Sequence, residues 1–203
     1  MPGLRLLACF AHPDDEAFPV GGVLAHNVAE GRRVRLITTT LGEEGEIRQE
    51  GAATKETLGE IRRTELGCAV RALRLESNEL YNYRDSGMAG WEANNHPRAY
   101  INAPDDEVLE RLVREIREFR PQVMLTFEPG GLYGHPDHIA ISKHATQAFS
   151  MAADPAVFPE QLSNGLQPHV AQRLFYSCRP KGFRLEWAQK LQAAGIDFPT
   201  PSE

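Results

Sequence analysis

The sequence has few cysteines, and they are scattered along the chain. Cys9, Cys68 and Cys178 are far apart, they are odd in number, and no two of them form a CxxC pair. This pattern argues against a disulfide framework and against a cysteine-based structural zinc site. It favours reduced thiols, so we expect a cytoplasmic protein.

The chain also lacks long hydrophobic runs and a surplus of positive charge. Its first apolar run, residues 4–10, is too short for a signal peptide and is interrupted by Arg5, and no other stretch reaches the length of a membrane span. Lys and Arg number 22 against 28 Asp and Glu, which gives a net charge of −6, and they form no basic block. We therefore expect neither a nucleic-acid partner nor a membrane partner.

What the chain does contain is an alternation of strand-like and helix-like segments. At 203 residues it is long enough to form one domain, 1–203, with a sizeable core. The strand-like runs are 4–10, 34–40, 79–81, 123–127 and 173–177. Helical spacing covers 16–30, 54–75, 104–120 and 139–151, with Pro136 suited to open the last of these. The alternation predicts an α/β fold, a three-layer sandwich with a mainly parallel sheet.

Two segments between these elements are rich in polar residues, Gly and Pro. Residues 82–103 form a long connection of the kind that usually serves as a binding loop or lid. Residues 154–169 are expected to form a surface excursion.

Two clusters of His and Asp directly follow strand-like runs. Ala-His-Pro-Asp-Asp-Glu at 11–16 comes after the first run, and Tyr-Gly-His-Pro-Asp-His at 133–138 comes shortly after 123–127. The carboxyl ends of parallel strands lie at one edge of the sheet, where ligands bind. We therefore expect the two clusters to meet, although they are remote along the chain.

The side chains in these clusters have the chemistry of a catalytic metal site. His12, Asp15 and His138 would supply three ligands, and catalytic zinc keeps three protein ligands and one open position. Bound zinc brings the pKa of water down to about 7, which makes hydroxide available at neutral pH. Iron(II) or another divalent ion would also suit this donor set.

Neighbouring residues have the chemistry of proton transfer. Asp14 is next to a ligand but points elsewhere, because adjacent side chains diverge, so it is a candidate general base. His135 precedes His138 by three residues on the first turn of a helix, where it would stabilise an oxyanion or protonate a leaving amine. Asp137 would orient one of the histidines.

Other interpretations of these patterns remain open. Each cluster alone is also typical of a turn followed by a helix N-cap. A structural metal site is disfavoured because three good ligands are present rather than four. A non-catalytic sugar- or nucleotide-binding α/β domain has little support, since no GxGxxG or P-loop pattern follows the first strand.

At these two clusters the sequence resembles the LmbE/PIG-L family of zinc-dependent deacetylases, which remove acetyl from N-acetylglucosaminyl conjugates. Residues 11–16 and 134–138 match the family's two signatures fully and in the right order. The resemblance implies a Rossmann-like sheet and a small-molecule amino-sugar substrate. It assigns zinc binding to His12, Asp15 and His138, the general base to Asp14, charge stabilisation to His135, and contact with the tetrahedral oxyanion to Tyr133.

Two further segments, 40–46 and 83–88, resemble the branch of the family that acts on the glucosaminyl-inositol precursor of mycothiol or on mycothiol conjugates. Arg62 falls where the family has a substrate-contacting arginine, and we expect Glu43 and Asp85 to contact the substrate as well. Enzymes of this branch have a longer C-terminal part that helps to close the pocket, and the sequence departs from the pattern there.

The function expected from the sequence is therefore zinc-dependent removal of acetyl from an N-acetylglucosaminyl conjugate or a related amino sugar. An amidase acting on a thiol conjugate with a larger acyl group is one alternative. A non-catalytic sugar-binding domain is the other. A homo-oligomer is compatible with the sequence.

Overall fold

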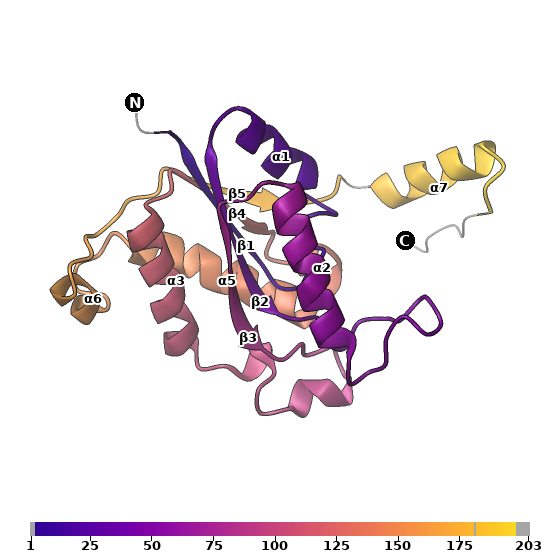
Figure 1. Ribbon diagram of the computed structural model, residues 1–203, viewed down its shortest axis with the longest axis horizontal. Helices are drawn as coiled ribbons and strands as arrows, with labels where there is room; N and C mark the ends of the chain where they lie inside the picture. The colour runs from indigo at the N-terminus through magenta and orange to yellow at the C-terminus, as the bar shows by residue number, and fades with distance from the viewer. Residues whose placement is uncertain (1–2, 181, 198–203) are drawn as a thin grey trace.

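A sheet of parallel strands runs through the middle of the molecule (Figure 1). The structure is a computed structural model that describes residues 3–180 and 182–197. Within these residues the strands are β1 (Arg5–Phe10), β2 (Arg33–Thr40), β3 (Ser77–Tyr83), β4 (Val123–Phe127) and β5 (Arg173–Ser177). Their order across the sheet is β3-β2-β1-β4-β5, and all neighbouring pairs are parallel. The predicted α/β class is confirmed.

Helices cover both faces of this sheet. The longer helices of the body are α1 (Gly21–Ala29), α2 (Leu58–Ala72), α3 (Asp105–Phe119) and α5 (Pro136–Met151). The chain crosses from β1 to β3 and then turns back toward β5, and right-handed crossovers place the helices of these two halves on opposite faces. Figure 1 shows α2 and α3 on opposite sides of the sheet, and α5 crosses the sheet on the side of α3. The three-layer prediction is therefore confirmed.

Helix α3 illustrates why the sequence forms these elements. Its apolar side chains recur at helical spacing, and all of them are buried against the sheet and α5: Val108, Leu109, Leu112, Val113, Ile116 and Phe119. Three acidic residues lie in its first turn, where the helix dipole favours negative charge. The helix ends at Arg120, whose φ of 54° is left-handed, and Pro121 follows.

The expected boundaries were wrong at several elements. The helix expected from residue 16 begins at Gly21, and residues 13–20 form turns instead. Pro19 explains this difference, because proline lacks an amide donor and disfavours helical backbone at the residue before it. The helix expected over 54–75 spans Leu58–Ala72, since Thr54 and Thr57 form a turn before it and Arg74 has a φ of 54° after it. The strand expected at 79–81 is longer, Ser77–Tyr83.

The two polar segments are held firmly by buried side chains. Residues 82–103 contain the short helices η1 (Glu92–Asn95) and η2 (Tyr100–Asn102), and the buried Tyr100 hydroxyl lies 2.8 Å from Nδ1 of His144 on α5. The second segment contains α6 (Pro159–Ser163), and the buried guanidinium of Arg117 donates to backbone carbonyls at 152–158, before this helix, and to the side chain of Gln161 within it. A last helix, α7 (Phe183–Ala193), follows β5.

The strand order creates a natural ligand site between β1 and β4. From β1 the chain goes to one face of the sheet and from β4 to the other, so the loops after these two strands separate and leave a crevice. Both polar clusters lie at this point, one after each strand, which is the convergence the sequence predicts. None of the described helices is long and apolar enough to cross a membrane.

Candidate metal and catalytic site

Side chains from the two clusters meet at the carboxyl edge of the sheet. Nδ1 of His12 lies 3.0 Å from Nε2 of His138. The Asp15 carboxylate lies 3.4 Å from Nε2 of His138 and 3.6 Å from Nδ1 of His12. A tetrahedral zinc ion with bonds of about 2.0–2.1 Å separates its ligands by roughly 3.3 Å. The three donors are therefore spaced as ligands of one ion would be.

Hydrogen bonds fix the donors of the first loop. Oδ2 of Asp15 accepts the backbone N–H groups of Ala11 at 3.1 Å and His12 at 2.8 Å, which closes the loop directly after β1. Both residues are almost fully buried, His12 with 5% and Asp15 with 6% exposure. Their positions are thus set by the backbone of the loop itself.

In both His12 and His138, one ring nitrogen contacts a hydrogen-bond acceptor, and the other ring nitrogen faces the remaining donors of the site. Nε2 of His12 lies 3.2 Å from Oδ2 of Asp137, and Nδ1 of His138 lies 3.2 Å from the carbonyl oxygen of Gly131. Acceptors at these positions favour the tautomers that leave Nδ1 of His12 and Nε2 of His138 with free lone pairs. Asp137 thus contacts His12 and is fully buried, and its expected role of orienting a histidine stays a prediction.

The electrostatics of the cluster favour a cation. Burial lowers the pKa of His12, but the carboxylates of Asp137, Asp15 and Asp85 outweigh it, so this pKa is raised well above its usual value. Without an ion, Nδ1 therefore also carries a proton, which a bound metal would displace to use the lone pair. Burial lowers the pKa of His138 to about 3, which keeps that ring neutral and able to donate a lone pair. Burial opposes ionisation of Asp15, but His12 and His138 lower its pKa overall.

Among the described residues, two sets of acidic and histidine side chains are close enough to hold one ion. One set is His12, His135 and His138, and the other is His12, Asp85, His135 and Asp137. Asp15 adjoins the first set through its contacts with His12 and His138. Both sets include His12, whose two ring nitrogens face different neighbours.

Asp14 has an unusual backbone that turns its side chain toward the cavity. Its φ is 99°, which is strained for a residue with a Cβ, and the buried Glu16 carboxylate accepts its N–H at 3.0 Å. Asp14 is 65% exposed at its side chain, in contrast to the buried Asp15. The adjacent carboxylates therefore diverge, as the sequence predicts.

Arg62 on α2 reaches across the cavity to Asp14. Its Nη2 donates to Oδ2 of Asp14 at 2.6 Å and to the carbonyl of Pro13, and its Nη1 donates to the carbonyl of Gly42 at 3.1 Å. Gly42 has a φ of 67°, and a Cβ at this position would overlap Nη1 of Arg62. Only glycine suits both the backbone and the close approach. The expected substrate contact of Arg62 stays a prediction.

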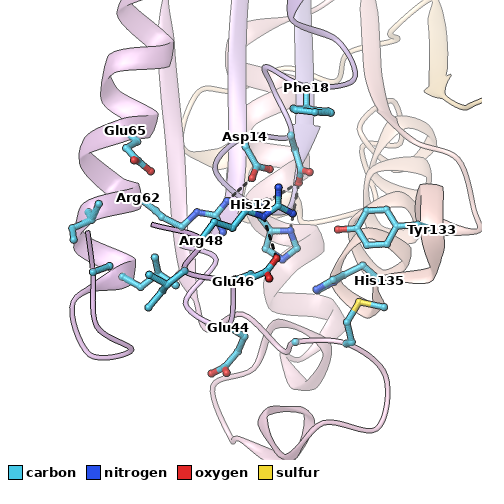
Figure 2. Close-up of a pocket in the computed structure, with 18 of the residues that line it drawn as sticks. His12, Asp14, Phe18, Glu44, Glu46, Arg48, Arg62, Glu65, Tyr133 and His135 are labelled. Atoms are coloured by element: carbon cyan, nitrogen blue, oxygen red, sulfur yellow. Dashed lines mark hydrogen bonds and ion pairs between the residues drawn. The ribbon is translucent and has the colours of Figure 1, made fainter. Parts of the chain in front are cut away.

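His135 and Tyr133 form the opposite side of the cavity. His135 is the N-cap of α5, where its Nδ1 accepts the N–H of Asp137 at 3.2 Å, and its Nε2 lies 3.8 Å from Asp85. Burial lowers the pKa of His135, so its neutral ring presents Nε2–H. The ring of Tyr133 lies 5.0 Å from that of His138, and Figure 2 shows Tyr133 and Arg62 extending into the cavity from opposite sides.

Neither of the two carboxylates expected to contact substrate is among the residues that line the cavity. Asp85 is 3% exposed, and its Oδ1 is 3.5 Å from Nε2 of His12. Burial opposes its ionisation, but its bond with His12 lowers its pKa overall. Glu43 accepts the backbone N–H of Asp85 at 3.0 Å, so it fixes the loop that follows β3. Their roles in substrate binding stay predictions.

The cavity above this cluster has a volume of about 790 Å³. His12 and His135 (Figure 2), together with Asp15, line the base of this cavity. We use the term floor for these residues and for His138, which contacts His12 and Asp15. The outer wall of the cavity includes residues that the sequence analysis did not select, namely Phe18, Ile47, Arg48, Glu65, Met88, Trp91 and Arg179. Met88 and Trp91 belong to the loop 82–103, which the sequence marked as a binding loop or lid, but nothing in the sequence distinguished the others from ordinary surface positions.

Comparison with known protein families agrees with this geometry. A family model described as "PIG-L: GlcNAc-PI de-N-acetylase" matches residues 7–149, which include both clusters and α2. The chain belongs to the PIG-L family. The resemblance inferred from the two motifs is thereby confirmed, and the family model spans the strands β1 to β4 that position the site.

Curated relatives within this family are similar over most of the chain. A deacetylase of Streptomyces scabiei, named for 1D-myo-inositol 2-acetamido-2-deoxy-alpha-D-glucopyranoside, is 41% identical over 199 residues, which are 94% of this chain and 60% of the relative. A deacetylase of the same name from Geodermatophilus obscurus is 40% identical over 210 residues, 99% of this chain and 70% of the relative. The chain thus spans about 60% of the length of the first of these relatives.

Two solved structures have a fold similar to this one. The N,N'-diacetylchitobiose deacetylase of Pyrococcus horikoshii superposes with a TM-score of 0.70 at 21% identity, covering 95% of this chain and 77% of that chain. A conserved protein of Thermus thermophilus superposes with a TM-score of 0.61 at 28% identity, covering 87% of this chain and 66% of that chain. The first of these similarities supports the fold alone.

Proposed function

We propose that this protein is a zinc-dependent deacetylase that hydrolyses the acetamide of an N-acetylglucosaminyl conjugate. Membership of the PIG-L family and the deacetylase names of its curated relatives support the reaction. The observation that carries the proposal is the approach of Nδ1 of His12, Nε2 of His138 and the Asp15 carboxylate within 3.0–3.6 Å of one another.

The residues that would hold the zinc are His12, Asp15 and His138. Their spacing, the neutral His138 ring and the surrounding carboxylates all fit a divalent cation. When bound, zinc polarises an amide carbonyl and makes water nucleophilic at neutral pH. The same donors would also bind iron(II), so the identification of zinc as the metal used in the cell is itself part of the proposal.

The residues around the metal position have the groups that amide hydrolysis needs. Asp14 would take a proton from the attacking water, and Arg62 holds its carboxylate at the cavity. The neutral His135 would donate its Nε2–H to the developing oxyanion, with the Tyr133 hydroxyl on the same side. The proton taken by Asp14 then passes to the leaving nitrogen, so that amine and acetate depart.

The substrate we infer is the N-acetylglucosaminyl-inositol for which the curated relatives are named. A cavity of about 790 Å³ suits a small-molecule conjugate of this size. The cavity wall has both charged side chains, such as Arg48 and Glu46, and apolar ones, such as Ile47. Such a wall suits a sugar, which has hydroxyl groups and apolar ring faces.

Acetate release from N-acetylglucosaminyl-inositol tests the reaction. We expect zinc-loaded protein to release acetate and amine in equal amounts, and protein stripped of metal to be inactive until zinc returns. Asp14→Asn should lower kcat by about 10²–10⁴-fold, because general-base catalysis contributes factors of that size. Its zinc content should stay unchanged, since Asp14 is directed away from the ligands.

The exposed Asp106 on α3 provides the matched control, and Asp106→Asn should retain wild-type rates. Equal rates for Asp14→Asn and wild type would refute the base assignment. Sugar binding without acetate release, despite bound zinc, would favour the non-catalytic alternative. Preference for acyl groups larger than acetyl would favour the thiol-conjugate amidase, which no comparison with known proteins supports.

A further inference from the structure

Ser86 is a fully buried residue in the loop after β3, and it contacts the acidic partner of His12. Its backbone N–H donates to Oδ2 of Asp137 at 3.0 Å, and its hydroxyl lies 2.7 Å from Oδ1 of the same carboxylate. One residue thus binds both oxygens of Asp137. The two residues come from opposite halves of the chain.

The direction of the hydroxyl bond follows from the chemistry of the two groups. An ionised carboxylate only accepts hydrogen bonds, so the Ser86 hydroxyl is the donor. The other acceptor near Oγ is the carbonyl of Gly87, at 3.5 Å, which is much longer than the 2.7 Å contact. The single hydroxyl proton therefore points at Asp137.

Asp137 in turn contacts His12. Its Oδ2 lies 3.2 Å from Nε2 of His12, while Nδ1 of the same ring lies 3.0 Å from Nε2 of His138. With Nε2–H donated to Asp137, Nδ1 is the nitrogen with the free lone pair. A chain of hydrogen bonds thus runs from Ser86 through Asp137 to the outer side of a metal-binding ring.

We propose that Ser86 is a positioning residue for the metal centre, acting through Asp137 to fix the tautomer and orientation of His12. The inference rests on the proposed function, because it takes His12 as a metal ligand. Partners of ligating histidines tune metal affinity, and their loss typically costs about 10–100-fold. Ser86 extends this arrangement one residue further from the ion.

The loop is built to hold Ser86 in this place. The side chain of Asn94 donates to the carbonyl of Ser86 at 2.6 Å, and the N–H of Gly87 donates to Oδ1 of Asp85 at 2.8 Å. These two bonds fix the backbone at Ser86 and at Gly87. The bond from the Ser86 hydroxyl to Asp137 is therefore already formed in the metal-free protein. Metal binding does not have to order this side chain.

Zinc affinity of the full chain, measured by competition with a chelator, tests the proposal without relying on turnover. Ser86→Ala removes the hydroxyl bond but keeps the backbone N–H bond, so we expect a loss of about tenfold, at the low end of the range for such partners. Ser142→Ala is the matched control. Ser142 is also buried, on the same helix as His138, but its hydroxyl donates to the carbonyl of Phe127 at 2.8 Å, so zinc affinity should change less than twofold.

A double-mutant cycle with Asp137→Asn separates positioning from general destabilisation. If Ser86 acts through Asp137, Ser86→Ala should cost less than about threefold once Asp137 is already changed. A tenfold loss in both backgrounds would mean that Ser86 acts independently of Asp137 and would overturn the proposal. Ser86→Thr, which keeps the hydroxyl, should bind zinc within about threefold of wild type; a folded Ser86→Thr with a tenfold loss would also overturn it.

The outcomes distinguish this inference from the proposed function. Wild-type protein that binds no zinc would overturn both. Wild-type protein that binds zinc and releases acetate, with Ser86→Ala of equal zinc affinity, would overturn only the role of Ser86. Should Ser86→Ala not fold, the zinc affinity of Ser86→Thr decides.

Discussion

The floor and the outer wall of the cavity are built in opposite ways. On the floor, His12, Asp15 and His138 are at most 6% exposed, and each has a hydrogen-bond partner that fixes its direction. On the wall, Phe18 is 87% exposed and Tyr133 is 53% exposed. Under the proposed function, this contrast predicts that the reaction depends on the fixed side chains of the floor and that the choice of substrate depends on the exposed side chains of the wall.

The largest expected effect comes from removing a floor donor. His138→Ala should abolish stoichiometric zinc binding and lower acetate release by at least about a thousandfold, because two donors no longer hold a catalytic ion. Metal analysis and initial rates measure both effects. His144→Gln is the control, since His144 is also buried on α5 but contacts Tyr100 and Asp105 instead. If His138→Ala kept its zinc, the floor would not be the metal centre.

The second-largest effect is expected from a substitution of Arg62, which lies between the floor and the wall of the cavity. Arg62→Lys should lower kcat/KM by roughly 10–100-fold, because a single ammonium cannot replace a planar fork that binds Asp14 and the carbonyls of Pro13 and Gly42. Steady-state kinetics measure the loss. The adjacent Arg63 is 44% exposed and does not line the cavity, so Arg63→Lys should behave as wild type. Equal losses in the two variants would contradict a specific role for Arg62.

A smaller effect contrasts the floor carboxylate of Asp15 with the half-buried carboxylate of Glu115. Histidines lower the pKa of Asp15, whereas burial raises the pKa of Glu115 on α3 to about 7. A raised folded-state pKa means that stability is complete below the ordinary value of 4.5 and is lost as the pH rises through about 7. Glu115→Gln should remove this loss, so that at pH 8 the variant is more stable than wild type by up to about 3 kcal/mol.

Urea unfolding at pH 5 and pH 8 measures this difference. The two proteins should have nearly equal free energies of unfolding at the lower pH and diverge at the higher one. The exposed Glu50 provides the control, and Glu50→Gln should follow wild type at both values. A Glu115→Gln variant that is less stable at pH 8 would show that the charged form is favoured in the folded protein.

The smallest effect is expected on the wall. Phe18→Ala should raise KM about two- to fivefold with kcat unchanged, since an exposed ring adds only some apolar contact to a bound conjugate. Stability should not change. Val170, 70% exposed and outside the cavity, serves as control through Val170→Ala. A large loss of kcat in Phe18→Ala would contradict the division between floor and wall.

The meeting of the two clusters could be predicted from sequence because it depends on topology. Parallel strands bring their carboxyl ends to one edge, so His12 and His138 converge once β1 and β4 are neighbours. The divergence of Asp14 and Asp15 was also predictable from their adjacency. These relations need only the order of the elements and not their exact bounds.

The contacts around the clusters could not be predicted because they depend on loop conformations. Arg62 reaches Asp14 only because Gly42 leaves room for it and Asp14 adopts a φ of 99°. The position of Ser86 depends on how the loop after β3 folds back onto Asp137. Neither a left-handed backbone at a non-glycine residue nor a contact between distant loops leaves a pattern in one sequence. The start of α1, in contrast, could have been predicted from the sequence, because Pro19 indicates that the helix begins after it.

The most direct test of the central claim is an anomalous difference map from crystals of the zinc-loaded protein. We expect one strong peak about 2.0–2.2 Å from Nδ1 of His12, from the Asp15 carboxylate and from Nε2 of His138. A peak instead among Nε2 of His12, Asp85, His135 and Asp137, or no peak at this edge of the sheet, would contradict the account.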